Sequence, residues 1–447
     1  MKDQISQIDR SVEKHRQLIL DAERYIWQNP ETGFKEWKTN SYLKEKYQAL
    51  GYTLTEAGDI PGFYTEIDTG REGPCVLILG ELDSVICPEH PDADPVTGAV
   101  HACGHNAQSA ALLGIAAALT EEGMLDALSG RIRLCAVPAE ELLEIGYRTS
   151  LRDKGVIRFF GGKTEFLSRG YFDGVDMAFM VHTGGNFSVH AGHIGCVTKN
   201  IIYKGKAAHA GGAPQLGINA LYAATCGLNA VNAIRETFLN SDLIRVHPIM
   251  TSGGGMVNAI PSTATLESYV RGKSFDAIVK ENKKVNRALI GAALSLGANV
   301  EIIDSPGYAP EHNDPELRHV AEEAAALAVG QYEFKSRTYN STGSTDMGDL
   351  SRIMPTVQPF CPGARGTGHG KDYYIVDPVA ACVDNAKFQL AMLSLLLSDG
   401  AKRARGIIDA YEPEYPSKES YLEFLDSLRD SGDRIEYRDD GSANVRL

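Results

Sequence analysis

The chain has 447 residues, more than a single compact core usually holds, so two or more domains are expected. Hydrophobic residues make up 43% of the sequence and charged residues 23%, which is typical of a globular protein. The net charge of −14 argues against a nucleic-acid partner.

Nothing in the sequence predicts secretion or insertion into a membrane. Residues 1–16 are polar and lack the apolar segment of a signal peptide, and no uninterrupted apolar run reaches the length of a membrane span. The eight cysteines are scattered, which favours a reducing compartment. We therefore expect a cytoplasmic protein with no membrane partner.

The first part of the chain alternates between helices and strands. The sequence predicts amphipathic helices over 8–28 and 41–50, buried strands over 75–80, 132–137 and 176–181, and a helix over 107–119. This alternation predicts a mainly parallel sheet. Polar residues follow each strand, at the edge where open α/β sheets bind their ligands.

The pattern changes near residue 193. Strands are predicted over 197–204, 243–251, 263–270 and 299–303, and helices over 217–234 and 275–296. This β-α-β-β-α-β order is typical of a ferredoxin-like domain. The helices predicted over 315–328 and 378–397 then resume the α/β pattern of the first part of the chain.

The predicted fold class is therefore α/β. A mainly parallel-sheet domain with helices on both faces, expected to carry any catalytic site, covers 1–192 and 307–402. A ferredoxin-like α+β domain, 193–306, is inserted in it. Residues 403–447 are predicted to form an acidic C-terminal extension, partly helical near 418–430.

Residues 101–106 read His-Ala-Cys-Gly-His-Asn and stand directly before the predicted helix. A thiol and imidazoles are ligands that soft and borderline metals prefer, so the hexapeptide indicates a metal site. The alternative is a structural cysteine flanked by surface histidines.

Glu140 and Glu141 follow the second strand and could supply a general base and a ligand. Their alternative is a solvated acidic turn.

Three further residues lie where they could complete such a site. His182 ends the third strand, His369 lies in a glycine-rich loop, and Asp83 lies where it could orient a metal-bound histidine. Each also has a plainer interpretation: His182 as a structural histidine, His369 as part of a surface loop, and Asp83 as the cap of a turn. Their shared position at the ends of strands favours one common site.

The inserted domain carries three more candidates. His209 follows a strand in the segment Gly205 to Ala210, and Asn258 lies in the segment 253–261. Arg271 lies on the next strand, and an arginine in a cleft suits a carboxylate through paired hydrogen bonds. On its own, Arg271 is better explained by a surface salt bridge.

Together these motifs resemble the metallopeptidase superfamily of aminoacylases, carboxypeptidases and indole-acetyl-amino-acid hydrolases. The closest branch is the one with a cysteine ligand. The resemblance covers residues 10–397 and holds in order and spacing. Its shared elements are 101–106, Pro-Ala-Glu-Glu at 138–141, His182, 205–210, Asn-Ala-Ile-Pro at 258–261 with Arg271, Ser-Thr-Asp-Met-Gly-Asp at 344–349, and His369.

The resemblance implies roles for individual residues. The implied metal ligands, for one or two Mn²⁺ or Zn²⁺ ions, are Cys103, His105, Glu141, His182 and His369. Glu140 is the implied general base and acid. His209 is expected to reach the substrate across a dimer interface formed by the inserted lid domains, and Asn258 and Arg271 to bind the substrate.

Two departures from the commoner pattern narrow the resemblance. Asn106 stands where most of the branch has Asp, and Gly80-Glu81-Leu82-Asp83 replaces the commoner Asp-Met-Asp version. Both features are similar to the sub-branch that contains the aminobenzoyl-glutamate hydrolases. The loop 155–162 matches no motif of known role.

The predicted function is metal-dependent hydrolysis of a small-molecule amide. The substrate would be an N-acyl or N-aroyl amino acid, or a small peptide, attacked by water that the metal activates and Glu140 deprotonates. One alternative is hydrolytic deamination of an aromatic amine at the same site, and another is a non-catalytic binding protein on the same scaffold. A homodimer or higher homo-oligomer through the inserted domain is expected.

Overall fold

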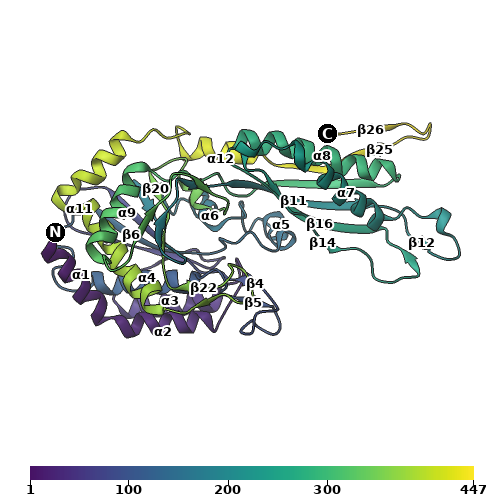
Figure 1. Ribbon diagram of the computed structural model, residues 1–447. Coiled ribbons are helices and arrows are strands. Elements are labelled where there is room, and N and C mark those ends of the chain that lie inside the picture. The colour runs from purple at the N-terminus through teal and green to yellow at the C-terminus, as the bar shows by residue number, and fades with distance from the viewer.

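The computed structural model describes residues 1–447, and its larger domain is built on a six-stranded sheet (Figure 1). From one edge to the other, its strands are β1 (Thr55–Glu56), β2 (Phe63–Asp68), β6 (Arg131–Val137), β3 (Cys75–Glu81), β7 (Met177–Phe179) and β20 (Thr356–Val357). The four strands from β6 to β20 are parallel, and β1 and β2 run antiparallel at the edge.

The strand β3 shows why helices cover both faces of this sheet. All seven of its residues are buried, and successive side chains of a strand point to opposite faces. Val76 and Ile78 join one hydrophobic core, whereas Leu77 and Leu79 join another. The predicted α/β class is thereby confirmed.

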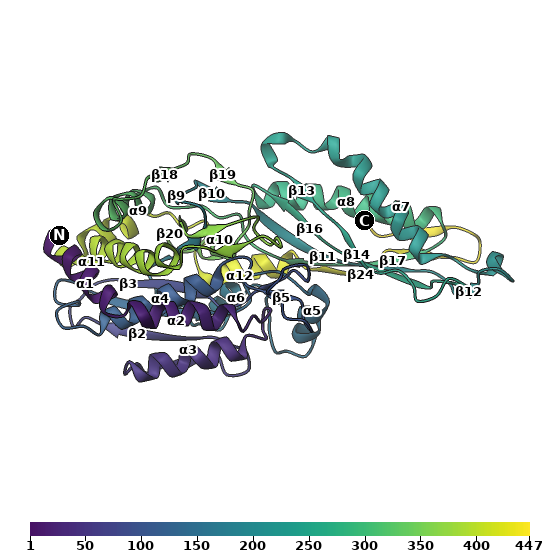
Figure 2. The same ribbon diagram turned by 60° about the horizontal axis from the view of Figure 1, so that its bottom comes forward.

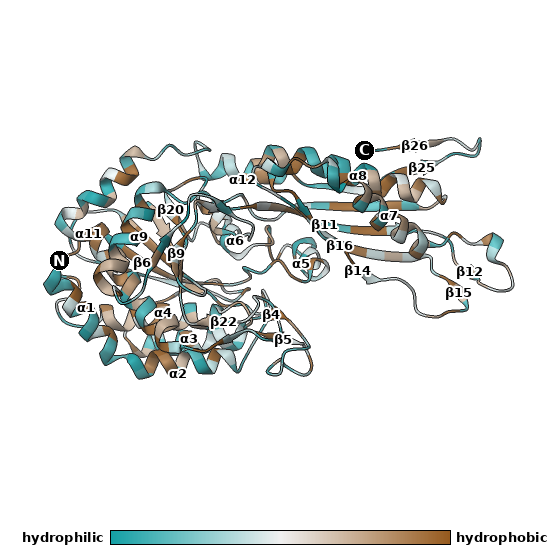
Figure 3. Ribbon diagram, viewed as in Figure 1, coloured by the Kyte–Doolittle hydropathy of each residue, from teal (hydrophilic) through white to brown (hydrophobic).

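Each face of the sheet has its own set of helices. The first core is formed with α1 (Lys2–Lys14), α2 (Arg16–Trp27), α3 (Trp37–Ala49), α4 (His105–Leu119), α9 (Pro315–Ala328) and α11 (Asn385–Ala410). The second is formed with α5 (Ile145–Asp153), α6 (Gly162–Ser168), α10 (Met347–Leu350) and α12 (Lys418–Ser427). The central strands are hydrophobic, and the outer helical surfaces carry hydrophilic residues (Figure 3).

Short strands extend the larger domain beyond the main sheet. A second sheet has the order β18 (Phe334–Ser336), β9 (Phe187–Val189), β21 (Pro359–Cys361) and β8 (His182–Thr183). Two-residue pairs join β4 (Val85–Ile86) to β5 (Ala99–Val100), β10 (Gly192–His193) to β19 (Asn340–Ser341), and β22 (Ala364–Arg365) to β23 (Tyr374–Ile375).

The inserted domain projects from one end of the larger domain (Figures 1 and 2). Its elements, in chain order, are β11 (Gly195–Lys204), β12 (Ala208–His209), α7 (Ala220–Ile234), β13 (Arg245–Val246), β14 (Ile249–Ser252), β15 (Ala259–Ile260), β16 (Thr263–Gly272), α8 (Phe275–Ser295) and β17 (Asn299–Pro306). Its antiparallel sheet runs β13–β16–β11–β17, with β14 also on β16. Both helices pack on this sheet around a third hydrophobic core.

Two chain segments cross between the domains side by side, and small residues allow their close approach. A Cβ atom on Gly195 would lie 2.4 Å from the nitrogen of Pro310, and one on Gly307 would lie 2.6 Å from Sγ of Cys196. Glycine is therefore needed at both positions for the strands to pass each other.

The C-terminal residues are part of both domains, which corrects the prediction of a separate extension over 403–447. Helix α11 continues to Ala410, and α12 places Tyr421 and Leu425 in the second core. The strand β24 (Asp430–Asp433) then pairs with β17 and becomes the edge of the inserted sheet. The hairpin of β25 (Ile435–Tyr437) and β26 (Ala443–Val445) ends the chain. Apolar side chains among the acidic ones account for this integration.

One helical stretch, Val379–Ala410, meets a length and composition test for a membrane span. Its most apolar window is 94% buried within the fold, and the helix packs against α1, α4 and α9, which is typical of a core helix.

Replacing Tyr421 by Ala should lower the free energy of unfolding by about 3–5 kcal/mol, because the ring is fully buried and its hydroxyl bonds Asp349 at 2.5 Å. Denaturant unfolding measures the effect. Tyr437→Ala is the matched control in the same segment, since that ring is 45% exposed. Equal losses in the two variants would contradict the packing of α12 as a core element.

Candidate metal centre

Polar side chains gather at the carboxyl edge of the central sheet. Glu81 ends β3, Glu140 and Glu141 follow β6, and His182 begins β8 just beyond β7. The loop before α4 brings Cys103 to the same edge. The resulting cavity has a volume of about 370 Å³ and contains Cys103, Glu140, Glu141, His182 and His369 in its wall.

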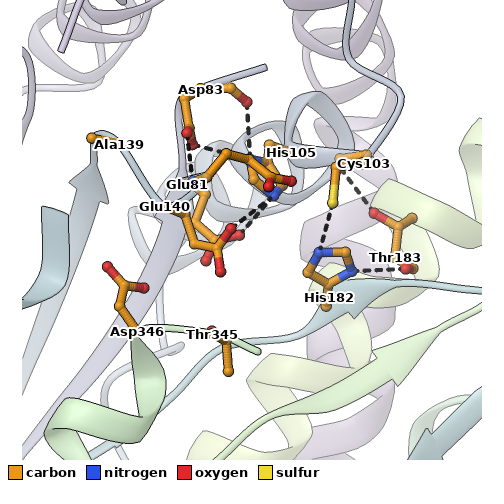
Figure 4. Close-up of polar contacts among 12 residues, drawn as sticks. Glu81, Asp83, Cys103, His105, Ala139, Glu140, His182, Thr183, Thr345 and Asp346 are labelled. Carbon is orange, nitrogen blue, oxygen red and sulfur yellow. Dashed lines mark hydrogen bonds and ion pairs between the residues drawn. The ribbon is translucent and has the colours of Figure 1, made fainter. Parts of the chain in front are cut away.

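Cys103 and His182 face each other across this edge (Figure 4). The Sγ of Cys103 lies 3.5 Å from Nε2 of His182. The other ring nitrogen, Nδ1, lies 2.8 Å from the carbonyl oxygen of Thr183 and must carry the proton, since a carbonyl only accepts. Burial and the Glu141 carboxylate raise the pKa of the Cys103 thiol, but His105 and His182 outweigh them and lower it to about 6.

Asp83 fixes the orientation of His105 in a similar way. Nδ1 of His105 lies 2.9 Å from the carbonyl oxygen of Asp83 and 3.2 Å from its Oδ1, so Nδ1 is the donor. The second carboxylate oxygen of Asp83 accepts the backbone N–H of Glu141 at 2.8 Å. Asp83 thus contacts two candidate ligands, and its role in orienting a metal-bound histidine stays a prediction.

Glu141 and His369 also line the cavity. The carboxylate Oε1 of Glu141 lies 3.0 Å from Nε2 of His369. His369 has a φ of 63°, and its backbone N–H donates to the carbonyl of Ala102 at 2.8 Å. That hydrogen bond holds the glycine-rich loop against residues 101–106 and positions the imidazole of His369 beside Glu141.

The donor atoms fit a divalent metal. Three sets of ligand atoms each lie within 4.8 Å of one another: Cys103, His105 and His182; Cys103, Glu141 and His369; and Glu81, His105 and Glu140. Cys103 and His105 each belong to two sets, so the donors would suffice to hold one or two ions. Nε2 of His105 and Oε2 of Glu81 are buried, lie 3.1 Å apart and have no hydrogen bond. A proton on Nε2 or a divalent metal ion would satisfy this pair, and a nitrogen beside a carboxylate oxygen is a donor set that suits a divalent metal.

Glu140 differs from its neighbour in having a carboxylate that is free of hydrogen bonds to the protein. Its Oε2 lies 4.0 Å from Nε2 of His105, and the residue lines the cavity. Burial, followed by repulsion from Glu81 and Glu141, raises the pKa of Glu140 well above its ordinary value. A carboxylate with a raised pKa is suited to accept and return a proton.

A buried ion network beneath the cavity was not recognised in the sequence. The Nζ of Lys163 lies 2.5 Å from Oε1 of Glu81 and also bonds Asp346, and all three side chains are fully buried. Burial lowers the pKa of Lys163, but Asp346 and Glu81 outweigh it and raise that pKa. Asp346 lies in the recognised segment 344–349, but its partner could not be read from the sequence.

Asn106 lies away from the ligand atoms and pairs with helix α2. Its Nδ2 donates to the buried carboxylate of Glu23 at 2.8 Å. An aspartate here would face a second buried carboxylate, so Glu23 accounts for the amide at this position.

The candidate substrate residues divide into two groups. Arg271 lines the cavity, where its Nη1 donates to Oγ of Ser344 at 3.3 Å. The structure does not bring His209 or Asn258 to the cavity of the same chain. Both are exposed at the β12–β15 tip, at the far end of the inserted domain (Figures 1 and 2). The predicted contact of His209 across a dimer interface stays a prediction.

Comparison with known proteins identifies the class of hydrolase to which this fold and cavity belong. The chain belongs to peptidase family M20/M25/M40, which matches residues 77–394. It is therefore a hydrolytic enzyme that acts on amide or peptide bonds, and the predicted superfamily and enzyme class are confirmed.

Individual relatives are similar over most of their length. The chain is 28% identical over 428 residues to a subunit of p-aminobenzoyl-glutamate hydrolase of Escherichia coli, with 79% of this chain and 82% of the relative covered. It is 27% identical over 366 residues to human Xaa-Arg dipeptidase, with 78% of each covered. A crystal structure of the Bacillus subtilis YXEP protein, a dinuclear metal-binding M20 peptidase, has a TM-score of 0.61 at 20% identity, with 86% of this chain and 99% of that chain covered.

Replacing Cys103 by Ala should lower the metal content of the purified protein, because the thiol is shared by two sets of candidate ligands. Elemental analysis after dialysis against excess Mn²⁺ or Zn²⁺ measures the stoichiometry. Cys226→Ala, at an exposed position on α7, is the matched control and should bind as much metal as the unmodified protein. An unchanged metal content in Cys103→Ala would remove this residue from the ligand set.

Replacing Lys163 by Met should lower the free energy of unfolding by about 3–5 kcal/mol, since two buried carboxylates lose their cation. Denaturant unfolding of the metal-free protein measures the loss. Lys418→Met breaks the more exposed pair with Asp173 and should cost less than about 1 kcal/mol. A small effect of Lys163→Met would show that Glu81 and Asp346 do not need this charge.

Proposed function

We propose that the enzyme cleaves the amide bond of an N-acyl or N-aroyl amino acid, or of a small peptide. The observation that carries the proposal is the free carboxylate of Glu140, buried beside the candidate ligands and open to the cavity. The similarity to p-aminobenzoyl-glutamate hydrolase makes an aroyl amino acid the first substrate to test.

The proposed chemistry assigns a different task to each of two adjacent carboxylates. When bound, a divalent metal acidifies water and polarises the carbonyl of the amide. Glu140 takes the proton from the attacking water and delivers it to the nitrogen of the leaving amine. Glu141, engaged with His369 and held by Asp83, keeps its place in the cavity wall.

The cavity also has a residue suited to the carboxylate of an amino acid. Arg271 lies in the same wall as Glu140 and has no carboxylate within 4.0 Å. A guanidinium can form two parallel hydrogen bonds to a carboxylate and so fix the direction of the scissile amide. Tyr269, beneath it at 5.1 Å from ring centre to guanidinium carbon, supports its plane.

The proposed cofactor is one or two ions of Mn²⁺ or Zn²⁺. The position of Cys103 in two sets of donors supports a pair, as does the description of the YXEP protein as a dinuclear metal-binding peptidase. Nitrogen and sulfur donors suit Zn²⁺, and the carboxylates are compatible with Mn²⁺.

We also propose a homodimer formed through the inserted domain. Tyr222 on α7 and Ile249 on the edge strand β14 are 63% and 60% exposed, and an unpaired strand edge with apolar side chains favours association. In each copy, the exposed His209 lies far from the cavity of its own chain. In such a dimer it would lie close to the cavity of the other copy. A monomeric mass in sedimentation velocity would contradict this proposal.

A panel of N-acyl and N-aroyl amino acids, tested with Mn²⁺ and with Zn²⁺, decides the reaction. Release of the free amine together with the carboxylic acid supports amide hydrolysis. Release of ammonia without a new carboxylic acid would instead indicate deamination of an aromatic amine. Metal binding without turnover on the whole panel would contradict an amidase.

Replacing Glu140 by Gln should lower kcat by roughly 10²–10⁴-fold while the metal content is retained, because the amide cannot accept the proton. Steady-state rates and elemental analysis on the same preparation separate the two properties. Glu45→Gln, at an exposed position on α3, is the matched control and should leave both unchanged. Activity within a few-fold of the unmodified enzyme would exclude Glu140 as the base.

A further inference from the structure

The turn after β6, which carries Glu140 and Glu141, has a costly backbone conformation. Ala139 lies just beyond the strand and directly before Glu140 (Figure 4). Its φ is 57°, in the left-handed region. A residue with a Cβ atom stays in that region only where its surroundings hold the chain there. The contacts around residues 139–141 show what holds this turn.

Two buried carboxylates bind the backbone N–H groups of the turn. Oε1 of Glu36 accepts the N–H of Ala139 at 2.7 Å, and Oδ2 of Asp83 accepts that of Glu141 at 2.8 Å. Both carboxylates are fully buried. A buried donor that lost such an acceptor would be left unpaired at a cost in free energy. The two carboxylates therefore fix N–H groups on either side of Glu140.

One arginine binds the carbonyl groups of the same turn. Arg148 lies on α5 and is only 1% exposed. Its Nη1 donates to the carbonyl oxygen of Ala139 at 3.3 Å, and its Nη2 donates to that of Glu141. Nη1 also donates to the carbonyl oxygen of Phe160, just before α6. The guanidinium therefore bridges the carbonyl groups on the two sides of Glu140.

The packing around Arg148 leaves its side chain little freedom. A Cβ atom on Gly33 would collide with Nη2 of Arg148 and lie 2.9 Å from Cα of Ala139, so glycine is needed there. The guanidinium carbon lies 5.4 Å from the ring centre of Phe34. Burying a charged group is costly, and the acceptors here are uncharged carbonyls. A need to fix this turn accounts for that cost.

We propose that Arg148 is a positioning residue for the base of the reaction. By bridging the carbonyl groups around Glu140, it fixes the direction in which this carboxylate enters the cavity. Arg148 itself is not part of the cavity wall. The inference rests on the proposed role of Glu140 and adds the residue that orients it. A base must lie within hydrogen-bond reach of the proton it takes, and a displacement of about 1 Å can cost about 10²-fold in rate.

Two simpler roles for Arg148 predict different behaviour. A residue needed only for folding would lower stability and leave the kcat of the folded enzyme unchanged. A residue that acts only through its charge would be replaced by lysine without loss. One ammonium group cannot span both carbonyls as the planar guanidinium does, so a bridging role predicts that lysine fails.

The test uses the full-length, metal-loaded enzyme and the amide that it cleaves fastest. Arg148→Met should lower kcat roughly 10–100-fold, with KM within about threefold of its original value and the metal content unchanged. Arg148→Lys should recover part of the lost stability, measured as the midpoint of denaturant unfolding. Its kcat should still be at least about tenfold low, because the bridge between the two carbonyls is missing.

Arg133→Met is the matched control, because Arg133 is another buried arginine that binds backbone carbonyls. Its Nη1 donates to those of Tyr171 and Asp173 at 2.7 and 3.1 Å, and it lies on β6 ahead of the turn. This variant should also lose stability, but its kcat should stay within about threefold of the unmodified enzyme, since the turn keeps its contacts.

Hydrogen exchange followed by mass spectrometry tests the turn without turnover. In Arg148→Met, the peptide that contains residues 139–141 should exchange faster than in the unmodified protein, and in Arg133→Met it should not. Unchanged exchange of this peptide, full kcat in either Arg148 variant, or a loss of activity that excess metal restores would overturn the positioning role. If the unmodified enzyme cleaves no amide, the proposed function fails, and the exchange of this peptide alone decides whether Arg148 fixes the turn.

Discussion

Repulsion among five carboxylates is the constraint on which the catalytic edge depends. Glu81, Asp83 and Asp346 are fully buried there, and Glu140 and Glu141 are less than a tenth exposed. At low effective dielectric constant, like charges so close together cannot all stay ionised unless cations lie among them. Lys163 supplies one such charge beneath the cavity. A metal ion held by the thiol and imidazole donors would supply further positive charge, and its binding would then be coupled to the stability of this edge.

The same network divides the carboxylates by task. Lys163 engages Glu81, and Asp83 is used by the ring of His105 and the backbone of Glu141. Glu140 is left with no hydrogen-bond partner in the protein and a raised pKa, in a cavity that a substrate can enter. Glu140 suits the proposed role of base because every neighbouring carboxylate is already paired with a cation or a hydrogen-bond donor.

The sequence predicts the local parts of this site and misses the long-range ones. Cys103, Glu140 and His182 could be found because each lies in a short motif at the end of a strand, and parallel strands bring their ends to one edge. The partners of Lys163 lie 82 and 183 residues away, so no spacing pattern reveals them. Glu36 likewise lies 103 residues from Ala139, whose N–H group it binds, so no motif links the two.

The C-terminal segment shows how composition alone can mislead about architecture. Its acidic residues suggest solvent exposure, yet Tyr421 lies in the core of the larger domain and Ile435 in that of the inserted domain. The chain therefore joins the domains a third time, in addition to the crossings at Gly195 and Gly307. Because β24 hydrogen-bonds along β17 while α12 is anchored by Asp349, any rotation of the inserted domain must bend the two residues between them. The three crossings lie at β11, β17 and β24, which are neighbours in the inserted sheet, so they restrain the inserted domain along this half of its sheet.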